Sequence, residues 1–213
     1  SSSIAGGTDE IQRNIIGDRV LGLPRDISVD TVYTLLPFSN TMVQLDMTGA
    51  EIVQVLDEGL AKRILILDLD VHQGNGTAEI FAGVPEVFTF SMHGRANYPF
   101  RKEESDLDVA LAPGTGDEEY LSTLEKHLSE LKKAVDPDFV FYLSGVDILA
   151  TDKLGTLGVS PEGCRTRDEL VFQWCHRQNL PVQCSMGGGY SPQLRTIVEA
   201  HANTFRLAQN LYF

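Results

Sequence analysis

The chain has 213 residues, of which 42% are hydrophobic and 22% are charged, and its formal net charge is −13 at pH 7. This composition is typical of a folded globular protein with one or two domains, and the negative charge argues against nucleic acid or an anionic membrane as a partner. The three cysteines lack CxxC spacing, which favours a reducing, cytoplasmic location over a disulfide framework. No apolar segment is long enough to span a bilayer.

The first 62 residues change character near residue 26. Thr8 can cap a short amphipathic helix, which Gly22 and Pro24 would end. Residues 27–62 predict extended structure with a break near residues 37–40, followed by an amphipathic helix that Thr48 can cap. We expect a short, irregular α+β segment here.

From residue 63 onward, predicted strands and helices alternate. Short apolar runs predict strands at residues 64–67, 87–91, 139–143 and 181–186. Apolar stripes at helical spacing predict helices at residues 118–135, 168–177 and 191–211. This alternation is typical of an α/β domain in which helices flank a parallel sheet.

Polar side chains follow the ends of several predicted strands, where parallel sheets usually bind ligands. Asp70 and His72 are two positions apart, so in extended backbone they point to the same side. Such a pair suits Zn²⁺ or a similar divalent ion, and Asp152, after the third predicted strand, is the expected third ligand. The alternative is that these polar residues only cap neighbouring backbone, because D-x-H alone is a weak pattern.

Tyr190 follows a run of glycines that includes Gly188 and Gly189. Such a loop can hold a side chain close to a ligand, and a phenol can donate a hydrogen bond to a developing oxyanion. The alternative is a tyrosine packed beside a tight turn. His93, at the end of the second predicted strand, could also lie near the site.

Four segments, "DLDVHQGNGT", "GTGDEEYL", "SGVDILATDKLGTLGVS" and "GGGYSP", resemble the C-terminal half of zinc-dependent histone deacetylase-like proteins. This resemblance covers residues 63–213 and implies part of the arginase–deacetylase fold. "RDELVF" and "DKLG" are most similar to the class IV branch and its bacterial relatives. The resemblance implies that Asp70, His72 and Asp152 bind Zn²⁺. It also implies that Tyr190 polarises the carbonyl of an acetylated lysine or another acylated amine.

The same resemblance suggests a site for a monovalent cation, K⁺, formed by Asp68 and Ser91 with nearby backbone carbonyls. Gln73 and Asn75 stand beside the metal ligands, where many relatives carry a histidine and an aspartate.

The family's N-terminal half contributes two adjacent histidines that act on the zinc-bound water, and this chain has no such pair. We therefore expect weak deacetylation or none, because general acid–base help is worth roughly 10²–10⁴ in rate. A partner chain could supply the missing half. The alternative is a non-catalytic, metal-binding or scaffold protein.

Residues 1–26 resemble the C-terminal end of acyl-CoA dehydrogenases, and residues 27–62 resemble part of the C-terminal domain of 5′-nucleotidases. The rest of each family's catalytic machinery is missing, so neither activity is expected, and neither FAD nor NAD is expected as a cofactor. The chain is interpreted as a composite, or chimera, with junctions near Asp26 and Arg63.

Overall fold

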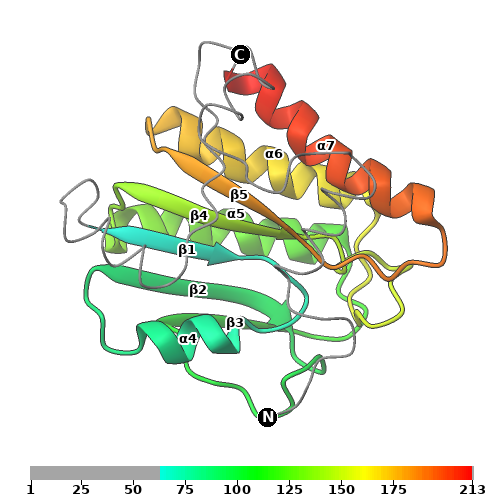
Figure 1. The fold of residues 1–213 in the computed structure, drawn as a ribbon, viewed down its shortest axis with the longest axis horizontal. Coiled ribbons are helices and arrows are strands. Elements are labelled where there is room, and N and C mark those ends of the chain that lie inside the picture. The colour runs from blue at the N-terminus through cyan, green and yellow to red at the C-terminus, as the bar shows by residue number, and fades with distance from the viewer. Residues whose placement is uncertain (1–62, 213) are drawn as a thin grey trace, which may run out of the picture. The chain divides into compact units, whose positions relative to one another are not determined.

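The computed structural model describes residues 63–212, and the predicted segments 1–26 and 27–62 lie outside them (Figure 1). Five strands and four helices follow one another in the described part of the chain. The strands are β1 (Ile64–Asp68), β2 (Val87–Gly94), β3 (Leu107–Leu111), β4 (Phe139–Gly145) and β5 (Val182–Gly187). The helices are α4 (Asn75–Phe81), α5 (Asp117–Ala134), α6 (Pro161–Arg177) and α7 (Leu194–Tyr212).

The strands form one parallel sheet in the order β3-β2-β1-β4-β5. The central strand, β1, pairs with β2 on one side and with β4 on the other, so that Ile64 lies between Val87 and Phe139. The sheet therefore extends from β1 in both directions, and the segments that follow β1 and β4 leave the sheet next to each other. This arrangement confirms the predicted α/β fold.

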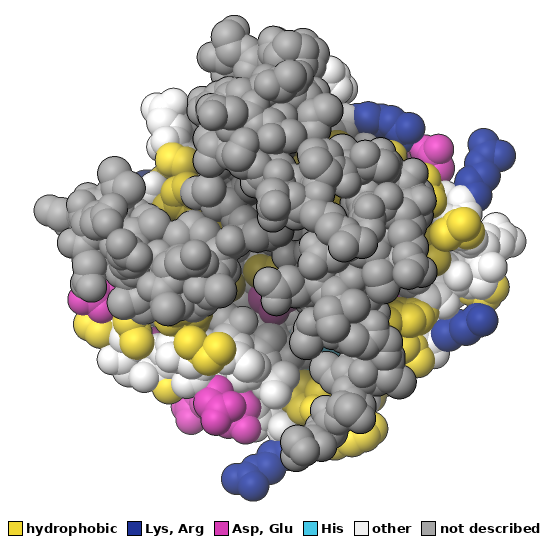
Figure 2. Space-filling model, viewed as in Figure 1, with side chains coloured by type: hydrophobic (Ala, Val, Ile, Leu, Met, Phe, Trp, Pro, Cys, Tyr) yellow, Lys and Arg dark blue, Asp and Glu magenta, His cyan; other side chains and the backbone are white. Residues whose placement is uncertain are grey.

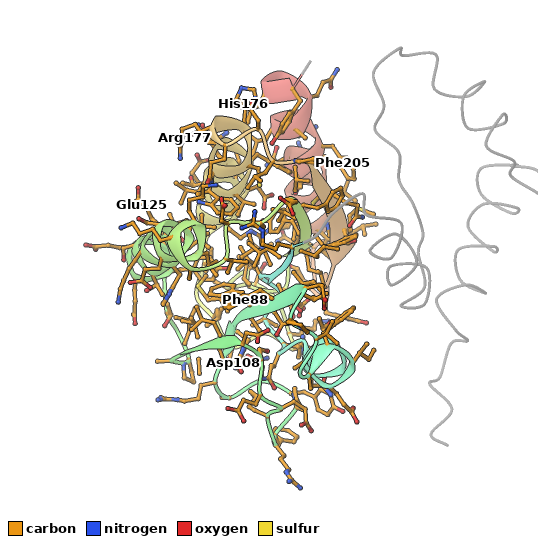
Figure 3. The ribbon with its side chains drawn as sticks, turned by 90° about the vertical axis from the view of Figure 1, so that its left-hand side faces the viewer. Phe88, Asp108, Glu125, His176, Arg177 and Phe205 are labelled. Atoms are coloured by element: carbon orange, nitrogen blue, oxygen red, sulfur yellow. The ribbon has the colours of Figure 1, made fainter. Side chains whose placement is uncertain are left out.

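Helices cover both faces of the sheet. Leu65 and Leu67 of β1 point into the larger apolar core, which α5, α6 and α7 complete. Ile64 and Ile66 point to the opposite face and pack with Phe81 of α4. Figure 3 shows α5, which carries Glu125, on one side of the strands and α4 on the other. Because both faces are covered, β1 is a continuous apolar run rather than an alternating pattern.

Strand β3 and helix α4 are present in the structure although the apolar patterns do not predict them. Helix α6 is longer than predicted. Helix α6 begins at Pro161, because the Ser160 hydroxyl accepts a hydrogen bond from the Gly163 N–H at 2.9 Å and caps the helix. The predicted start at residue 168 is therefore too late, and a cap followed by proline is the signal that marks the true start.

The visible part of the surface mixes side-chain types. Figure 2 shows hydrophobic side chains at several separate places around this face, with charged side chains between them. Among the described residues, no helix is long and apolar enough to cross a membrane.

Candidate metal centre

Asp70, His72 and Asp147 meet at the C-terminal edge of the sheet. Asp70 lies two residues beyond the end of β1, and Asp147 lies two residues beyond the end of β4. One ligand atom of each residue lies within 4.8 Å of the others. Adjacent parallel strands thus deliver two carboxylates and one imidazole to the same point.

The imidazole of His72 lies between the two carboxylates. Its Nδ1 is 3.0 Å from Oδ1 of Asp70 and 3.2 Å from Oδ2 of Asp147. Backbone hydrogen bonds fix both acids: the Val71 N–H donates to Oδ1 of Asp147 at 3.0 Å, and the His72 N–H donates to Oδ1 of Asp70 at 2.8 Å. The three side chains are therefore held together before any ion binds.

Glycines make room for the two carboxylates. A Cβ on Gly145 would lie 2.7 Å from Oδ2 of Asp70, and one on Gly187 would lie 3.0 Å from the same atom. A Cβ on Gly188 would lie 2.5 Å from the carboxyl carbon of Asp147. Larger residues at these positions would therefore press on the acids, so the glycines form a cradle around the cluster.

The electrostatics of the cluster favour a cation. Hydrogen bonds to Asp147 and Asp70 raise the pKa of His72 to about 10. Burial raises the pKa of Asp147, whereas the hydrogen bonds from His72 outweigh burial and lower the pKa of Asp70. Two carboxylates close to one nitrogen atom favour a positive charge at that place. A donor set of two aspartates and one histidine suits a divalent ion such as Zn²⁺. The residues present therefore fit a metal.

Asp152, the predicted third ligand, lies outside this group of three side chains, and Asp147 lies within it. The carboxylate of Asp152 turns into its own loop, where Oδ1 accepts hydrogen bonds from the Leu154 and Gly155 N–H groups at 2.8 and 2.9 Å. Its Oδ2 accepts a hydrogen bond from the Tyr190 N–H at 2.7 Å. Asp152 thus ties the loop after β4 to the loop after β5.

Tyr190 follows Gly188 and Gly189 directly, and its side chain is 59% exposed. Gly188 and Gly189 have φ values of +70° and +115°, which few other residues adopt. Gly188 passes close to Asp147, and the side chain of Tyr190, two positions later, is exposed.

Asp68 and Ser91 face each other in the register of β1 and β2. Both are buried, and burial raises the pKa of Asp68 to about 8. The Ser91 hydroxyl lies 3.0 Å from Nδ1 of His93, which is also buried and does not join the metal cluster.

Gln73 is buried and anchors a loop. Its amide donates to the Glu103 carbonyl at 2.7 Å and to Asp108 at 2.9 Å, and its oxygen accepts from the Glu103 N–H at 2.9 Å. Asn75 is the first residue of α4, and its N–H donates to the Gln73 carbonyl at 2.8 Å.

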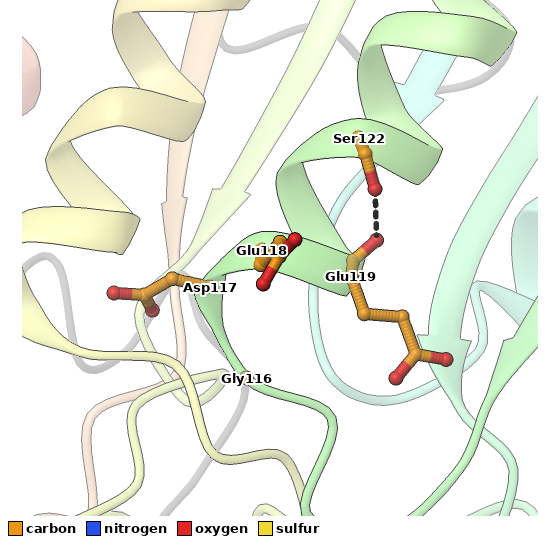
Figure 4. A pocket seen from close by; sticks show the side chains of 5 residues that line it. All are labelled: Gly116, Asp117, Glu118, Glu119 and Ser122. Carbon is orange, nitrogen blue, oxygen red and sulfur yellow. Dashed lines mark hydrogen bonds between the residues drawn. The ribbon is translucent and has the colours of Figure 1, made fainter.

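A separate pocket lies at the N-terminus of α5. Gly116, Asp117, Glu118, Glu119 and Ser122 line it (Figure 4). The carboxylate of Asp117 is occupied by the N–H and hydroxyl of Ser160 at 2.7 and 2.6 Å. None of the lining residues belongs to the metal cluster, so this pocket is not part of the candidate centre.

The sequence shows Asp147 only as a second aspartate after the same predicted strand, because it does not show how neighbouring strands are aligned. In the structure Asp68 is level with Leu143, so Asp147 lies further along its segment than Asp70 does. The predicted ligand Asp152 lies later in the same loop.

The histone deacetylase domain model matches residues 49–205, which is more than half of the chain, so the chain belongs to that family. The match begins at residue 49, upstream of the predicted junction near Arg63. An uncharacterised protein of Picosynechococcus is 46% identical over 158 residues, which are 74% of this chain and 53% of that protein. Histone deacetylase 2 of Arabidopsis thaliana is 35% identical over 148 residues, 68% of this chain and 38% of that protein.

A solved structure has a similar fold. The crystal structure of a histone deacetylase homologue from Aquifex aeolicus superimposes with a TM-score of 0.63 at 25% identity, covering 76% of this chain and 45% of that one. The chain thus spans about half, or less, of the length of these relatives.

Proposed function

We propose that this chain carries the metal-binding half of a Zn²⁺-dependent amide hydrolase that acts on acetylated lysine or another acylated amine. The observation that carries this proposal is the convergence of Asp70, His72 and Asp147 within 4.8 Å at the sheet edge. Membership of the histone deacetylase domain family supports the reaction and the substrate class.

The residues take distinct roles in this proposal. Asp70, His72 and Asp147 would hold the Zn²⁺, which supplies Lewis-acid chemistry to an amide carbonyl. Tyr190 donates a hydrogen bond to the carbonyl oxygen as negative charge develops there. Asp152 acts through Tyr190 by holding its backbone N–H, and Gly188 and Gly189 allow the turn that brings this loop past Asp147.

A second cation site is proposed beside the first. Asp68 and Ser91 offer a carboxylate and a hydroxyl from neighbouring strands, and oxygen ligands of this kind suit K⁺. Oδ1 of Asp68 also accepts the Asp70 N–H at 3.0 Å. An ion at Asp68 would therefore steady the backbone next to a Zn²⁺ ligand. Gln73 and Asn75 stand beside these sites and are proposed to tune the cluster through the loop that they hold.

We propose weak or absent turnover for the chain by itself, because its sequence has no pair of adjacent histidines to serve the attacking water. A partner chain that carries the missing half would restore the reaction. The same feature favours a second candidate, a metal-binding or scaffold protein without catalysis.

We further propose that the chain lies in the class IV or bacterial branch of the family, as "RDELVF" suggests. We also propose that residues 1–62 are a composite of pieces from two other families and are joined to a deacetylase-like half at residues 63–213. The three free cysteines, Cys164, Cys175 and Cys184, support a cytoplasmic location.

Zn²⁺ stoichiometry tests the metal centre. The full chain is loaded with Zn²⁺, desalted and analysed for bound metal by mass spectrometry. Asp147→Asn is expected to lose the ion, because it removes one of three ligands. Asp152→Asn tests the other predicted ligand in the same way, and it is expected to keep the ion if Asp147 is the third ligand. Equal loss in both variants, or no bound Zn²⁺ in the wild type, would contradict the proposal.

A further inference from the structure

We infer that Arg167, buried in α6, is a positioning residue that holds together the two strand ends that carry the metal ligands. This inference rests on the proposed function, since it concerns the same Zn²⁺ centre. Arg167 and its neighbour Asp168 are both 0% exposed. A fully buried arginine is rare and needs a reason, because its charge costs free energy to remove from water.

The guanidinium of Arg167 reaches the backbone on both sides of the centre. Its Nη1 donates to the Gly145 carbonyl at 2.5 Å and to the Leu69 carbonyl at 3.4 Å. Leu69 directly precedes Asp70, and Gly145 lies two residues before Asp147. One side chain thus bonds to the backbone beside both acidic ligands.

These carbonyls lie beyond the point where β1 and β4 pair with each other. The pairing of β1 with β4 ends at Asp68 and Leu143, whereas β4 still pairs with β5 as far as Gly145. Beyond Leu143 the ladder no longer joins the segments that carry Asp70 and Asp147 to each other, and buried carbonyls still need donors. Arg167 supplies them from a single rigid group, and this fixes the separation of the two segments.

Asp168 holds the guanidinium in place. Its Oδ1 accepts a hydrogen bond from Nε of Arg167 at 2.9 Å and forms an ion pair with Nη2 at 2.8 Å. The hydroxyls of Tyr142 and Thr204 also donate to this carboxylate, from β4 and α7. The charge of Arg167 is therefore balanced, and its position is set by three different elements. A lysine could replace the charge but not the planar fork that makes these bonds at once.

The affinity for Zn²⁺ tests this role separately from folding. The dissociation constant is measured on the full chain by competition with a chromophoric chelator, and thermal unfolding is measured alongside. Arg167→Met is expected to weaken Zn²⁺ binding by roughly 10–100-fold, the usual effect of losing a group that orients metal ligands. Arg167→Lys and Asp168→Asn are expected to weaken it less, and they carry the test if Arg167→Met does not fold.

Trp174→Phe is the matched control. Trp174 lies on the same helix and also donates to a backbone carbonyl, that of Leu128 at 2.9 Å, but this carbonyl lies in α5, which carries no metal ligand. The control is expected to unfold at a lower temperature and to bind Zn²⁺ as the wild type does.

Wild-type affinity in the Arg167 and Asp168 variants would overturn the inference and leave the proposed function intact. The inference also fails if Trp174→Phe weakens binding as much as Arg167→Met does. If the wild type and Asp147→Asn bind Zn²⁺ equally weakly, the proposed metal centre fails, and the role of Arg167 fails with it.

Discussion

Gly188 controls how closely the loop after β5 approaches the candidate metal centre. Its φ of +70° is unfavourable for residues with a side chain, and a Cβ there would lie 2.5 Å from the carboxyl carbon of Asp147. The backbone conformation and the contact with Asp147 therefore both require glycine at position 188. A substitution at Gly188 and one at a second glycine can separate these two requirements.

Gly188→Ala is expected to lower both the free energy of unfolding and the affinity for Zn²⁺. The backbone strain costs about 1–2 kcal/mol, and the new methyl displaces Asp147. Gly83→Ala is the matched control, because Gly83 has a φ of +75° but no atom within 4 Å of an added Cβ. It should lose similar stability without losing Zn²⁺ affinity, as measured by urea unfolding and chelator competition. Equal Zn²⁺ affinity in the two variants would contradict the expectation.

The acidic residues after β4 show what could be predicted at the residue scale. Asp70 and His72 are predicted from their spacing alone, because both follow the same strand. The predicted third ligand follows another strand, and two aspartates follow that strand. The choice between Asp147 and Asp152 depends on how the loop turns: backbone N–H groups of Leu154, Gly155 and Tyr190 draw Asp152 away. Residue type alone does not contain that information.

At the scale of elements, α7 attaches to α6 through polar contacts inside an apolar interface. Thr204 of α7 donates to Oδ2 of Asp168 at 2.6 Å, and both residues are buried. His201, three positions before Thr204, has an Nδ1 atom that is buried without a hydrogen-bond partner among the described residues. The stability of this helix pair therefore depends on a few polar groups.

Thr204→Val is expected to lower the free energy of unfolding by about 1.5–3 kcal/mol, because a hydrogen bond to a buried charged group is lost. Thr115→Val is the matched control, since the buried Thr115 hydroxyl has no partner in the described part of the chain. Its removal is expected to be neutral or stabilising. Chemical denaturation of both variants checks this. Similar destabilisation by the two substitutions would show that the Asp168 contact is unimportant.

The lowered pKa of His201 is expected to make part of the free energy of unfolding depend on pH. Burial, and then the charge of Arg167, lower the pKa of His201 below its ordinary value of 6.5. Above that value the imidazole is neutral in the folded and the unfolded chain. As the pH falls below it, the unfolded chain binds a proton that the folded chain does not, so the free energy of unfolding decreases. His201→Gln is expected to lose this part of the decrease in urea unfolding measured at about pH 7.5 and about pH 5.5. The expectation is wrong if the free energy of unfolding changes equally between these pH values in the variant and the wild type.

The elements that the sequence predicted are those with strong patterns. Strand β1 is apolar throughout its first four residues, and α5 has a leucine stripe, so both were found. Strand β3 lies at the edge of the sheet and is partly exposed, so its pattern is weak. Helix α4 has seven residues, includes Gly76, and lacks a side-chain cap. Packing against Ile64 and Ile66, not local propensity, keeps it helical.

At the scale of the whole molecule, the chain carries three side chains that could hold a metal ion, and it spans about half of the length of its relatives. The described residues include one histidine in the metal cluster, His72.

The purified chain is expected to hydrolyse an acetylated lysine peptide weakly or not at all, because a missing general base costs roughly 10²–10⁴ in rate. Release of acetate in the presence of Zn²⁺ is the measurement. Robust hydrolysis that Tyr190→Phe abolishes would show that the expectation of low activity is wrong. The same hydrolysis without loss in Tyr190→Phe would contradict the role of Tyr190 as well.

The central position of β1 also determines the order in which the molecule can assemble. Ile64 pairs with Val87, 23 positions later, and with Phe139, 75 positions later. Closing the longer loop costs more chain entropy, so β1 and β2 can associate while β4 is still unpaired. Asp70 and Asp147 come together only with the distant pair. During synthesis on the ribosome, the proposed ligand set is therefore incomplete until the segment through Asp147 has emerged, and an ion could bind there only after that point.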